Sequence, residues 1–328
     1  MPLYKHWDIL IKPALDCIEL HHIVEIGADS GENTKKILEY CRQRSARLTT
    51  IDCVPSSEVL ALLDKHRDIF TLIDTTSLEA LPKLSGYDAI LIDGDHNWYT
   101  VYHELKAVED TFIGADTFPL VFFHDVAWPY GRRDMYYAPE RIPDKFCHEY
   151  GKKGMIPGQS NLMEEFGVNA ILCNALHEGG DRNGVLTAIE DFIKDSKSTS
   201  YHFTSFNAYH GLGVILSQET IKRFPKLAEI TDCITCSAEI GNDMQNMLFD
   251  TIRLLLNINE KENLLSKLTR ENDSINKEIK KIRNSRSYHT MLLLKRIARL
   301  TGILALLRFG LRIKGKMLNR RKVRVPSF

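Results

Sequence analysis

Short, continuous apolar runs alternate with helical patterns through the first half of the chain. Between the runs, apolar residues return at three- and four-residue spacing, as on one face of a helix. Apolar runs without polar alternation predict strands buried on both faces, as in a parallel sheet covered by helices. The predicted strands are 23–26, 48–51, 70–73, 89–92 and 120–123, and the predicted helices are 34–41, 57–65 and 98–108.

The pattern changes between residues 128 and 184, where Pro, Gly, Tyr and charged residues replace it. A long irregular stretch within a globular domain is usually an active-site lid or a disordered insert, and its aromatic content favours the lid. A helix is predicted over 185–193, followed by strands 201–206 and 213–216 that form a terminal hairpin. We therefore expect an α/β fold, a Rossmann-like doubly wound sheet that is mostly parallel with a C-terminal antiparallel hairpin.

A heptad pattern begins after residue 231. Charged residues fill the positions around one continuous a/d seam, which predicts a coiled-coil helix and a homodimer. The alternative is a single amphipathic helix folded back on the domain. Three polar residues weaken the seam, although a lone Asn at an a position also fixes the register of a dimer. The seam consists of Met247, Thr251, Leu254, Ile258, Lys261, Leu265, Leu268, Asn272, Ile275, Ile279 and Ile282.

Charge is distributed unevenly although the 43 basic and 43 acidic residues cancel. From Arg286 to the end there are twelve Lys or Arg and no acid, interspersed with leucines, and the longest uncharged stretch, 300–307, is too short to span a bilayer. This composition is typical of a helix that lies on an anionic membrane surface. The alternative partners of this segment are a protein such as a glycosyltransferase, or nucleic acid. The many leucines favour lipid, so no nucleic acid is expected.

These patterns predict a domain over 1–230 with the lid at 128–184, a coiled-coil helix over 240–285 and a basic amphipathic tail over 286–328. Seven scattered cysteines and the lack of a secretory leader predict a cytoplasmic protein. The basic tail predicts that the protein is peripheral at the inner face of the membrane. Cys233 and Cys236 have C-x-x-C spacing, but no second ligand pair accompanies them.

A glycine-containing turn follows the first predicted strand, in the segment VEIGADSGENT. Glu25 lies at the strand end, and Gly27 and Gly31 allow a sharp turn around Ser30 before a helix whose N-terminus favours anionic or nucleotide-like ligands. A dinucleotide-binding fold would show G-x-G-x-x-G here. The segment instead resembles motif I of the class I methyltransferases that use S-adenosylmethionine (SAM), which implies that these four residues line a SAM site.

Two further acids follow the next strands. Asp52 ends the second predicted strand, where an acid can accept hydrogen bonds from both ribose hydroxyls of a nucleotide. Asp74 ends the third, where the resemblance implies contact with the adenine. A lone Asp after a strand often caps a helix instead, but three acids at three consecutive strand ends favour a shared cofactor site.

The segment YDAILIDGDHNWY places Asp93, Asp95 and His96 after the fourth strand, and FFHD places His124 and Asp125 after the fifth. Carboxylates that converge from neighbouring strand ends repel one another unless a cation lies between them. An oxygen-rich site of this kind suits Mg²⁺ together with water and substrate oxygens.

This arrangement resembles the metal-dependent O-methyltransferases of the catechol and caffeoyl-CoA type and the related macrolide-sugar O-methyltransferase and cephalosporin-hydroxylase group. The resemblance implies that Asp93 contacts both metal and cofactor, that Asp125 is a second metal ligand and that His96 is the general base. The base in the catechol type is Lys, and Val126 stands where that type has Asn. Either His124 supplies the third ligand, therefore, or the metal keeps an extra water.

His96 suits the chemistry, since an imidazole with a pKa near 6.5 is neutral and able to accept a proton at physiological pH. The alternative is a capping or core histidine.

In the lid, aromatic rings and cations are mixed, which suits stacking on sugar faces and pairing with phosphate or carboxylate. The glycine-rich turn 177–184 is a second candidate for acceptor contact. The lid set is Trp128, Tyr130, Arg132, Arg133, Tyr136, Tyr137 and Arg141.

The function that these features favour is a SAM-dependent, Mg²⁺-assisted O-methyltransferase that acts on a hydroxyl of a sugar or surface-glycan precursor. One alternative keeps SAM and the metal but takes a small natural product or a phenol as acceptor. Another is a non-catalytic scaffold that acts through the coiled coil and the basic tail, against which the intact set of Asp52, Asp93, His96 and Asp125 argues.

Overall fold

A computed structural model describes most of the chain, in four segments with short gaps between them. The chain divides into two compact units, Met1–Leu256 and Asn257–Phe328. The described residues are 3–115, 117–164, 166–196 and 200–300.

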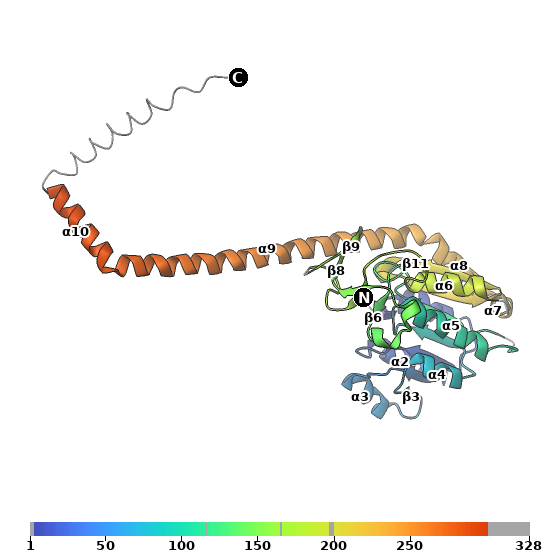
Figure 1. Ribbon diagram of the computed structural model, residues 1–328. Helices are drawn as coiled ribbons and strands as arrows, with labels where there is room; N and C mark the ends of the chain where they lie inside the picture. Colours follow the sequence, from blue (N-terminus) through green and yellow to red (C-terminus); the bar gives the residue numbers. More distant parts are fainter. Residues whose placement is uncertain (1–2, 116, 165, 197–199, 301–328) are drawn as a thin grey trace, which may run out of the picture. The chain divides into compact units, whose positions relative to one another are not determined.

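The first unit is built on a seven-stranded sheet with the order β11-β12-β5-β4-β1-β2-β3 (Figure 1). β1 to β5 are parallel to one another, and the hairpin of β11 and β12 joins them antiparallel through β12 and β5. The predicted Rossmann-like sheet is thus confirmed, with strand ends within one residue of those expected. The strands are β1 His22–Ile26, β2 Arg47–Ile51, β3 Phe70–Ile73, β4 Ala89–Ile92, β5 Leu120–His124, β11 Tyr201–Phe206 and β12 Leu212–Ser217.

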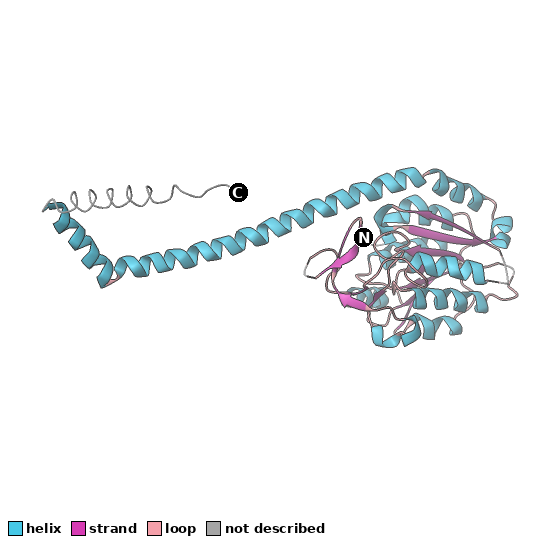
Figure 2. Cartoon of the chain, turned by 45° about the horizontal axis from the view of Figure 1, so that its top comes forward, coloured by secondary structure: helices cyan, strands magenta, loops and turns pink. Residues whose placement is uncertain are grey.

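Helices cover both faces of the sheet (Figure 2). Ile23 and the helix residue Ile37 lie in one buried apolar cluster, whereas Val24 and the helix residues Leu105 and Ile189 lie in another on the opposite face. Successive strand residues are therefore buried on both sides, which explains the continuous apolar runs. The helices of four or more residues in this part are α1 Lys12–Leu15, α2 Glu32–Arg44, α3 Ser57–Lys65, α4 Ser77–Ala80, α5 Trp98–Thr111, α6 Val185–Asp195, α7 Gln218–Arg223 and α8 Lys226–Cys236, preceded by the short helical turns η1 Leu3–His6 and η2 Trp7–Ile11.

The segment between β5 and α6 is more ordered than its sequence predicted. It forms two small sheets, β6 Met135–Tyr136 with β10 Cys173–Ala175 and β7 Tyr150–Lys152, and β8 Gly154–Ile156 with β9 Gln159–Met163. Strands of two to five residues are too short to produce a recognisable alternation.

One buried carboxylate ties this lid to the domain. Asp134 accepts hydrogen bonds from the backbone N–H groups of Trp98 and Gly184, both at 2.7 Å, and from the Tyr136 hydroxyl at 2.8 Å. Trp98 begins α5 and Gly184 directly precedes α6. Asp134 thus holds the lid against the first turns of two helices of the central domain.

Beyond α8, the chain continues as α9 Ala238–Asn284 and α10 Arg286–Leu300. The heptad stripe of α9 is solvent-exposed at Leu254, Leu265 and Ile282, with exposed fractions of 60% or more. The predicted coiled coil therefore remains a prediction, and residues 301–328 of the predicted tail lie outside the described residues. Within the described residues, no helix combines the length and the apolar character needed to cross a bilayer.

The cysteines form no disulfide. All seven are free, and Cys233 and Cys236 are exposed on α8.

Candidate active site

The turn after β1 is shaped by glycine. Gly27 and Gly31 have φ values of +81° and +78°, which residues with a side chain rarely adopt. A Cβ on Gly27 would lie 2.2 Å from the backbone oxygen of Asp93, because the turn packs directly on the end of β4. Ser30 is exposed between the two glycines. The turn thus joins the predicted cofactor segment to the predicted metal segment.

Glu25 lies beneath this turn. Its carboxylate accepts hydrogen bonds from Asn33 (2.9 Å), Thr34 (2.8 Å) and Thr50 (2.9 Å), and the side chain is 1% exposed. Burial raises the pKa of Glu25 to about 7, against the effect of these hydrogen bonds. Glu25 therefore supports the turn from inside the fold, and its contact with a cofactor stays a prediction.

Asp52 and Asp74 lie at the ends of β2 and β3, as predicted. Asp52 accepts hydrogen bonds from the backbone N–H of Ala28 and of Val54, both at 2.9 Å, and so connects the glycine turn to the loop after β2. Asp74 is exposed at the corresponding position of the neighbouring strand. Their contacts with a ribose and an adenine stay predictions.

Asp93, His124 and Asp125 gather at the carboxyl edge of β4 and β5. One ligand atom of each lies within 4.8 Å of the others, and among the described residues this is the one such group of three or more His, Cys, Asp or Glu. His124 Nδ1 lies 3.1 Å from Asp93 Oδ1 and 2.9 Å from Asp125 Oδ2. The predicted metal ligands are thus brought together, and of the two possibilities for the third ligand the geometry favours His124.

The orientation of His124 is fixed from its other side. Its Nε2 lies 3.1 Å from the backbone oxygen of Tyr209, which can only accept a hydrogen bond, so Nε2 carries a proton. Burial alone would lower the pKa of His124, but the carboxylates of Asp93 and Asp125 outweigh it and hold that pKa well above its ordinary value. A protonated His124 thus bridges the two carboxylates, and once its Nδ1 loses the proton the same imidazole and two carboxylates form a donor set that fits a divalent cation.

His96 lies beside this cluster, between β4 and α5. It is 8% exposed, and its Nδ1 lies 3.4 Å from Asp125 Oδ2. Its ring stacks on that of Tyr130 in the lid, with centroids 5.5 Å apart and planes 11° apart, and its carbonyl accepts a hydrogen bond from Met135. Asp95, in contrast, accepts hydrogen bonds from His96 N–H and Thr100 and is absent from the ligand group.

Two further histidines near the cluster were not expected. His6 is 2% exposed, with its ring centroid 6.4 Å from that of His124, and its Nε2 has no hydrogen-bond partner among the described residues. His210 lies 6.2 Å from His124 and hydrogen-bonds to the carbonyl of Trp128. Burial lowers the pKa of both, that of His6 to about 3. No motif marks His6, because only folding brings the first residues to this edge.

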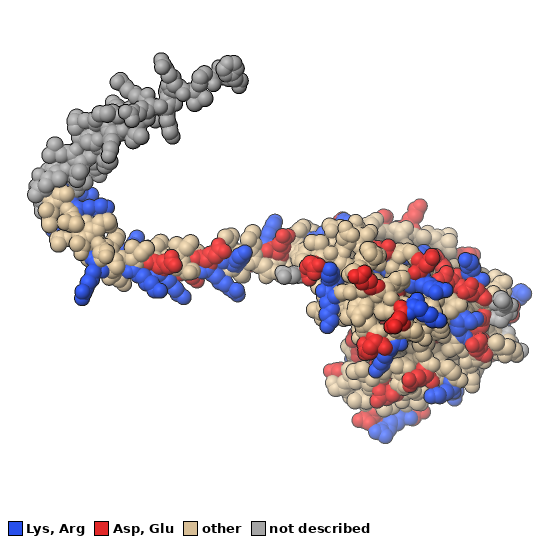
Figure 3. Space-filling model, viewed as in Figure 1, with Lys and Arg blue, Asp and Glu red and all other residues tan. Residues whose placement is uncertain are grey.

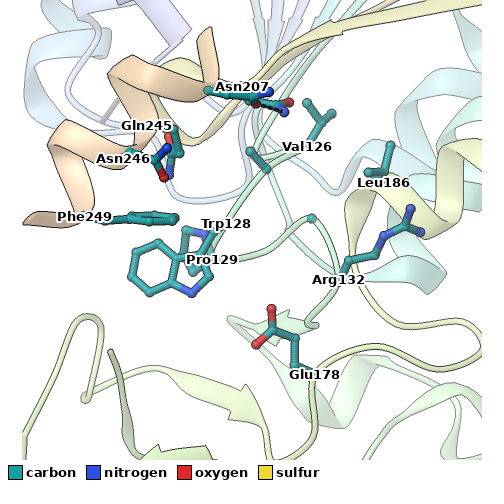
Figure 4. A pocket seen from close by; sticks show the side chains of 13 residues that line it. Val126, Trp128, Pro129, Arg132, Glu178, Leu186, Asn207, Gln245, Asn246 and Phe249 are labelled. Atoms are coloured by element: carbon teal, nitrogen blue, oxygen red, sulfur yellow. Dashed lines mark hydrogen bonds between the residues drawn. The ribbon is translucent and has the colours of Figure 1, made fainter. Parts of the chain in front are cut away.

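A cavity of about 440 Å³ borders the same segment of chain (Figure 4). Its lining includes Val126, which follows Asp125 in the chain, but none of Asp93, His96, His124 and Asp125. Its wall also includes Trp128, whose ring makes an edge-to-face contact with Phe249 of α9 at 5.1 Å. Gln245 of α9 also lines it, and its carboxamide is buried without a hydrogen-bond partner among the described residues. The coiled-coil prediction did not include these two contributions of α9, whereas the alternative of a helix folded back on the domain allows contacts of this kind.

The lid cations are mostly engaged within the protein. Arg132 pairs with Glu190 through two contacts of 2.6 and 2.7 Å, and Arg133 is 1% exposed and donates to the carbonyls of Ala175 and Ser160. These two arginines therefore order the lid, and their pairing with phosphate or carboxylate of an acceptor stays a prediction. Arg141 and Tyr137 remain exposed, whereas Tyr136 is buried against Asp134.

Residues 24–126 match a family model that is described as a methyltransferase domain. The match starts in the strand before the glycine turn and ends one residue after Asp125, so it spans the turn, the two strand-end acids and the histidine-carboxylate cluster. Over these residues the chain is similar to a methyltransferase domain. The lid, the cavity wall from α9 and the C-terminal helices lie outside the match.

Solved structures resemble the methyltransferase chain only distantly. The methyltransferase PaMTH1 of Podospora anserina, bound to S-adenosylhomocysteine, has 16% identity and a TM-score of 0.39, over 63% of this chain and 75% of its own. A Staphylococcus aureus protein assigned as a caffeoyl-CoA O-methyltransferase has 14% identity and a TM-score of 0.38, over 63% and 81%. Likeness at this level says nothing about the acceptor. No curated protein matches the sequence.

Proposed function

We propose that this methyltransferase is a metal-assisted O-methyltransferase whose acceptor is a hydroxyl group of a sugar or surface-glycan precursor. The observation that carries the proposal is the group of Asp93, His124 and Asp125, with His96 beside it, at the sheet edge that follows the glycine turn. Catalysis of transfer to a hydroxyl needs a proton acceptor and benefits from a cation at the attacking oxygen.

His96 is the group that we assign to remove the proton. Because its Nδ1 faces Asp125 at 3.4 Å, the tautomer with a proton on Nδ1 is favoured, and Nε2 is left as the acceptor. With SAM bound, Nε2 would take the proton of the hydroxyl while the oxygen bonds to the methyl carbon and S-adenosylhomocysteine leaves with the electrons of the carbon–sulfur bond. A divalent cation held by Asp93, His124 and Asp125, which the sequence predicts as Mg²⁺, would lower the pKa of the hydroxyl.

The cavity bordered by Val126 has a wall that suits a sugar. Its wall combines the indole of Trp128 with the carboxamides of Asn207 and Gln245, and aromatic faces with amide groups suit a neutral polyhydroxylated ligand. The charge of Arg132 at the same wall is already paired with Glu190. The Trp128 and Phe249 rings would also accept a phenol or a small natural product, which is the second candidate.

The test is methyl transfer from labelled SAM to a panel of nucleotide sugars, lipid-linked glycans and phenols. We expect His96→Ala to lower turnover by roughly 10² or more, and Asp93→Ala or Asp125→Ala to remove activity together with its dependence on a divalent cation. His202→Ala, on the outer strand β11, is the control and should keep full turnover. Full activity in excess chelator would refute the assisting metal, and transfer only to phenols would refute the sugar.

A further inference from the structure

The ligand set at the edge of β4 and β5 differs from the all-oxygen set that Mg²⁺ prefers. We propose that this centre selects a first-row transition-metal dication over Mg²⁺, and that His124 is the residue that makes the selection. The inference rests on the proposed function, because the same cation would assist the acceptor hydroxyl, and it names the class of metal that the site takes.

The first support is the direction in which His124 presents its nitrogen. Nδ1 lies 3.1 Å from a carboxylate oxygen of Asp93 and 2.9 Å from one of Asp125, so it points to where the two carboxylates converge. The hydrogen bond from Nε2 to the carbonyl of Tyr209 fixes the ring and leaves the lone pair on Nδ1 when the imidazole is neutral. Histidines that bind metals are commonly oriented by a second hydrogen bond of this type.

The second support is the small number of protein oxygens at the centre. Asp93 and Asp125 provide the carboxylates, while the next residue, Val126, is 2% exposed and has no ligand atom. A further nitrogen lies close by, since the unpartnered Nε2 of His6 is buried and the ring centroids of His6 and His124 are 6.4 Å apart. Imidazole favours Zn²⁺, Co²⁺, Ni²⁺ and Fe²⁺, whereas carboxylate and water favour Mg²⁺.

A metal-free alternative has the same geometry. A protonated His124 between Asp93 and Asp125 would neutralise the two carboxylates by itself, as the ion-pair distances allow. In that case the centre would bind no dication firmly, and its affinity for transition metals would resemble that for Mg²⁺. The experiment below separates this arrangement from a metal site.

The test titrates the full chain, stripped of metals by chelation, with Co²⁺ and with Mg²⁺ in separate calorimetric experiments, and follows Co²⁺ by its visible spectrum. We expect Co²⁺ to bind at least roughly tenfold more tightly than Mg²⁺. His124→Asp replaces the nitrogen by oxygen and should lower this Co²⁺ preference by roughly 10-fold or more, with a changed Co²⁺ spectrum. Equal affinities for the two metals in the unmodified chain, or an unchanged ratio in His124→Asp, would overturn the proposal.

The matched control is His210→Asn. His210 lies near the cluster, but its ring nitrogen is directed to the Trp128 carbonyl, so the metal preference should not change. Binding of SAM to each variant, measured by calorimetry, shows that the domain is folded. Methyl transfer with Mg²⁺ as the better cation would refute the metal selection alone, whereas firm Co²⁺ binding without transfer to any hydroxyl would refute the proposed function alone.

Discussion

Asp125 occupies a backbone conformation that few residues with a side chain adopt, with φ at +58° directly after β5. This conformation places its carboxylate within 2.9 Å of His124 and 3.4 Å of His96. Burial would raise the pKa of Asp125, but the two histidines hold it below its ordinary value, so the group stays ionised. A single carboxylate thereby connects the proposed base to the proposed metal ligands.

Glu104 on α5 provides a test of burial at the level of one residue. It is fully buried, neither carboxylate oxygen has a partner among the described residues, and burial raises its pKa to about 8. The folded state thus keeps a proton that the unfolded state loses above its ordinary pKa, so the free energy of unfolding falls as pH rises from about 4.5 to about 8. Each pKa unit corresponds to about 1.4 kcal/mol, which makes several kcal/mol the upper limit.

Glu104→Gln removes this titration. We expect the free energy of unfolding of the variant, relative to that of the unmodified chain, to be higher at pH 8 than at pH 5. Urea unfolding at both pH values measures this difference. Glu39→Gln, on the exposed side of α2, is the control and should show no pH-dependent difference. An equal stability difference for Glu104→Gln at the two pH values would show that the group is ionised in the folded state.

The residues of the candidate site that directly follow strands could be predicted from the sequence. Asp93, His124 and Asp125 were expected to meet because parallel strands end at the same edge of a sheet, and they do. His6 could not be found in this way, since it reaches the cluster from the first helical turn of the chain. The internal role of Glu25 was also missed, because a motif gives the position of a side chain but not the direction in which it points.

At the level of elements, burial on both faces made the sheet predictable. A strand such as β4 has the expected bounds because every residue of a central strand can be apolar. The lid strands have no such signal. Their positions depend on polar anchors, above all on the buried Asp134 and its three hydrogen bonds, and hydropathy does not report such anchors.

The heptad stripe of α9 leads to a prediction about this helix. Leu265 and Leu268 lie on the a/d seam and are 65% and 52% exposed, and burying such a stripe against a second copy would stabilise a dimer. We expect the double variant Leu265→Asp/Leu268→Asp to shift the full chain from dimer to monomer in sedimentation velocity. Leu264→Asp lies outside the seam at 57% exposure and should leave the dimer intact. A monomeric unmodified chain would contradict the coiled coil.

At the scale of the whole molecule, the two ends of the chain differ in charge. Acidic and basic side chains are interspersed over the face of the first unit shown in Figure 3, whereas the chain from Arg286 onward contains basic residues and no acids. α10 is helical and exposes Met291, Leu293 and Leu294 among its basic residues. Exposed apolar and basic side chains on one helix are typical of a segment that binds at a membrane interface.

We therefore propose that the tail brings the methyltransferase to an anionic membrane surface, where lipid-linked glycans would be within reach. Anionic lipid adds up to about 1 kcal/mol for each basic residue near the surface, so several of the twelve would retain the chain on a vesicle. We expect the full chain to co-sediment with vesicles that contain anionic lipid at low salt, and a chain that ends at Asn284 to remain in the supernatant. Neutral vesicles and high salt, which screens these charges, are the controls and should release the full chain. If both chains stay in the supernatant at low salt, the tail does not bind lipid and its partner should be sought in a protein interface.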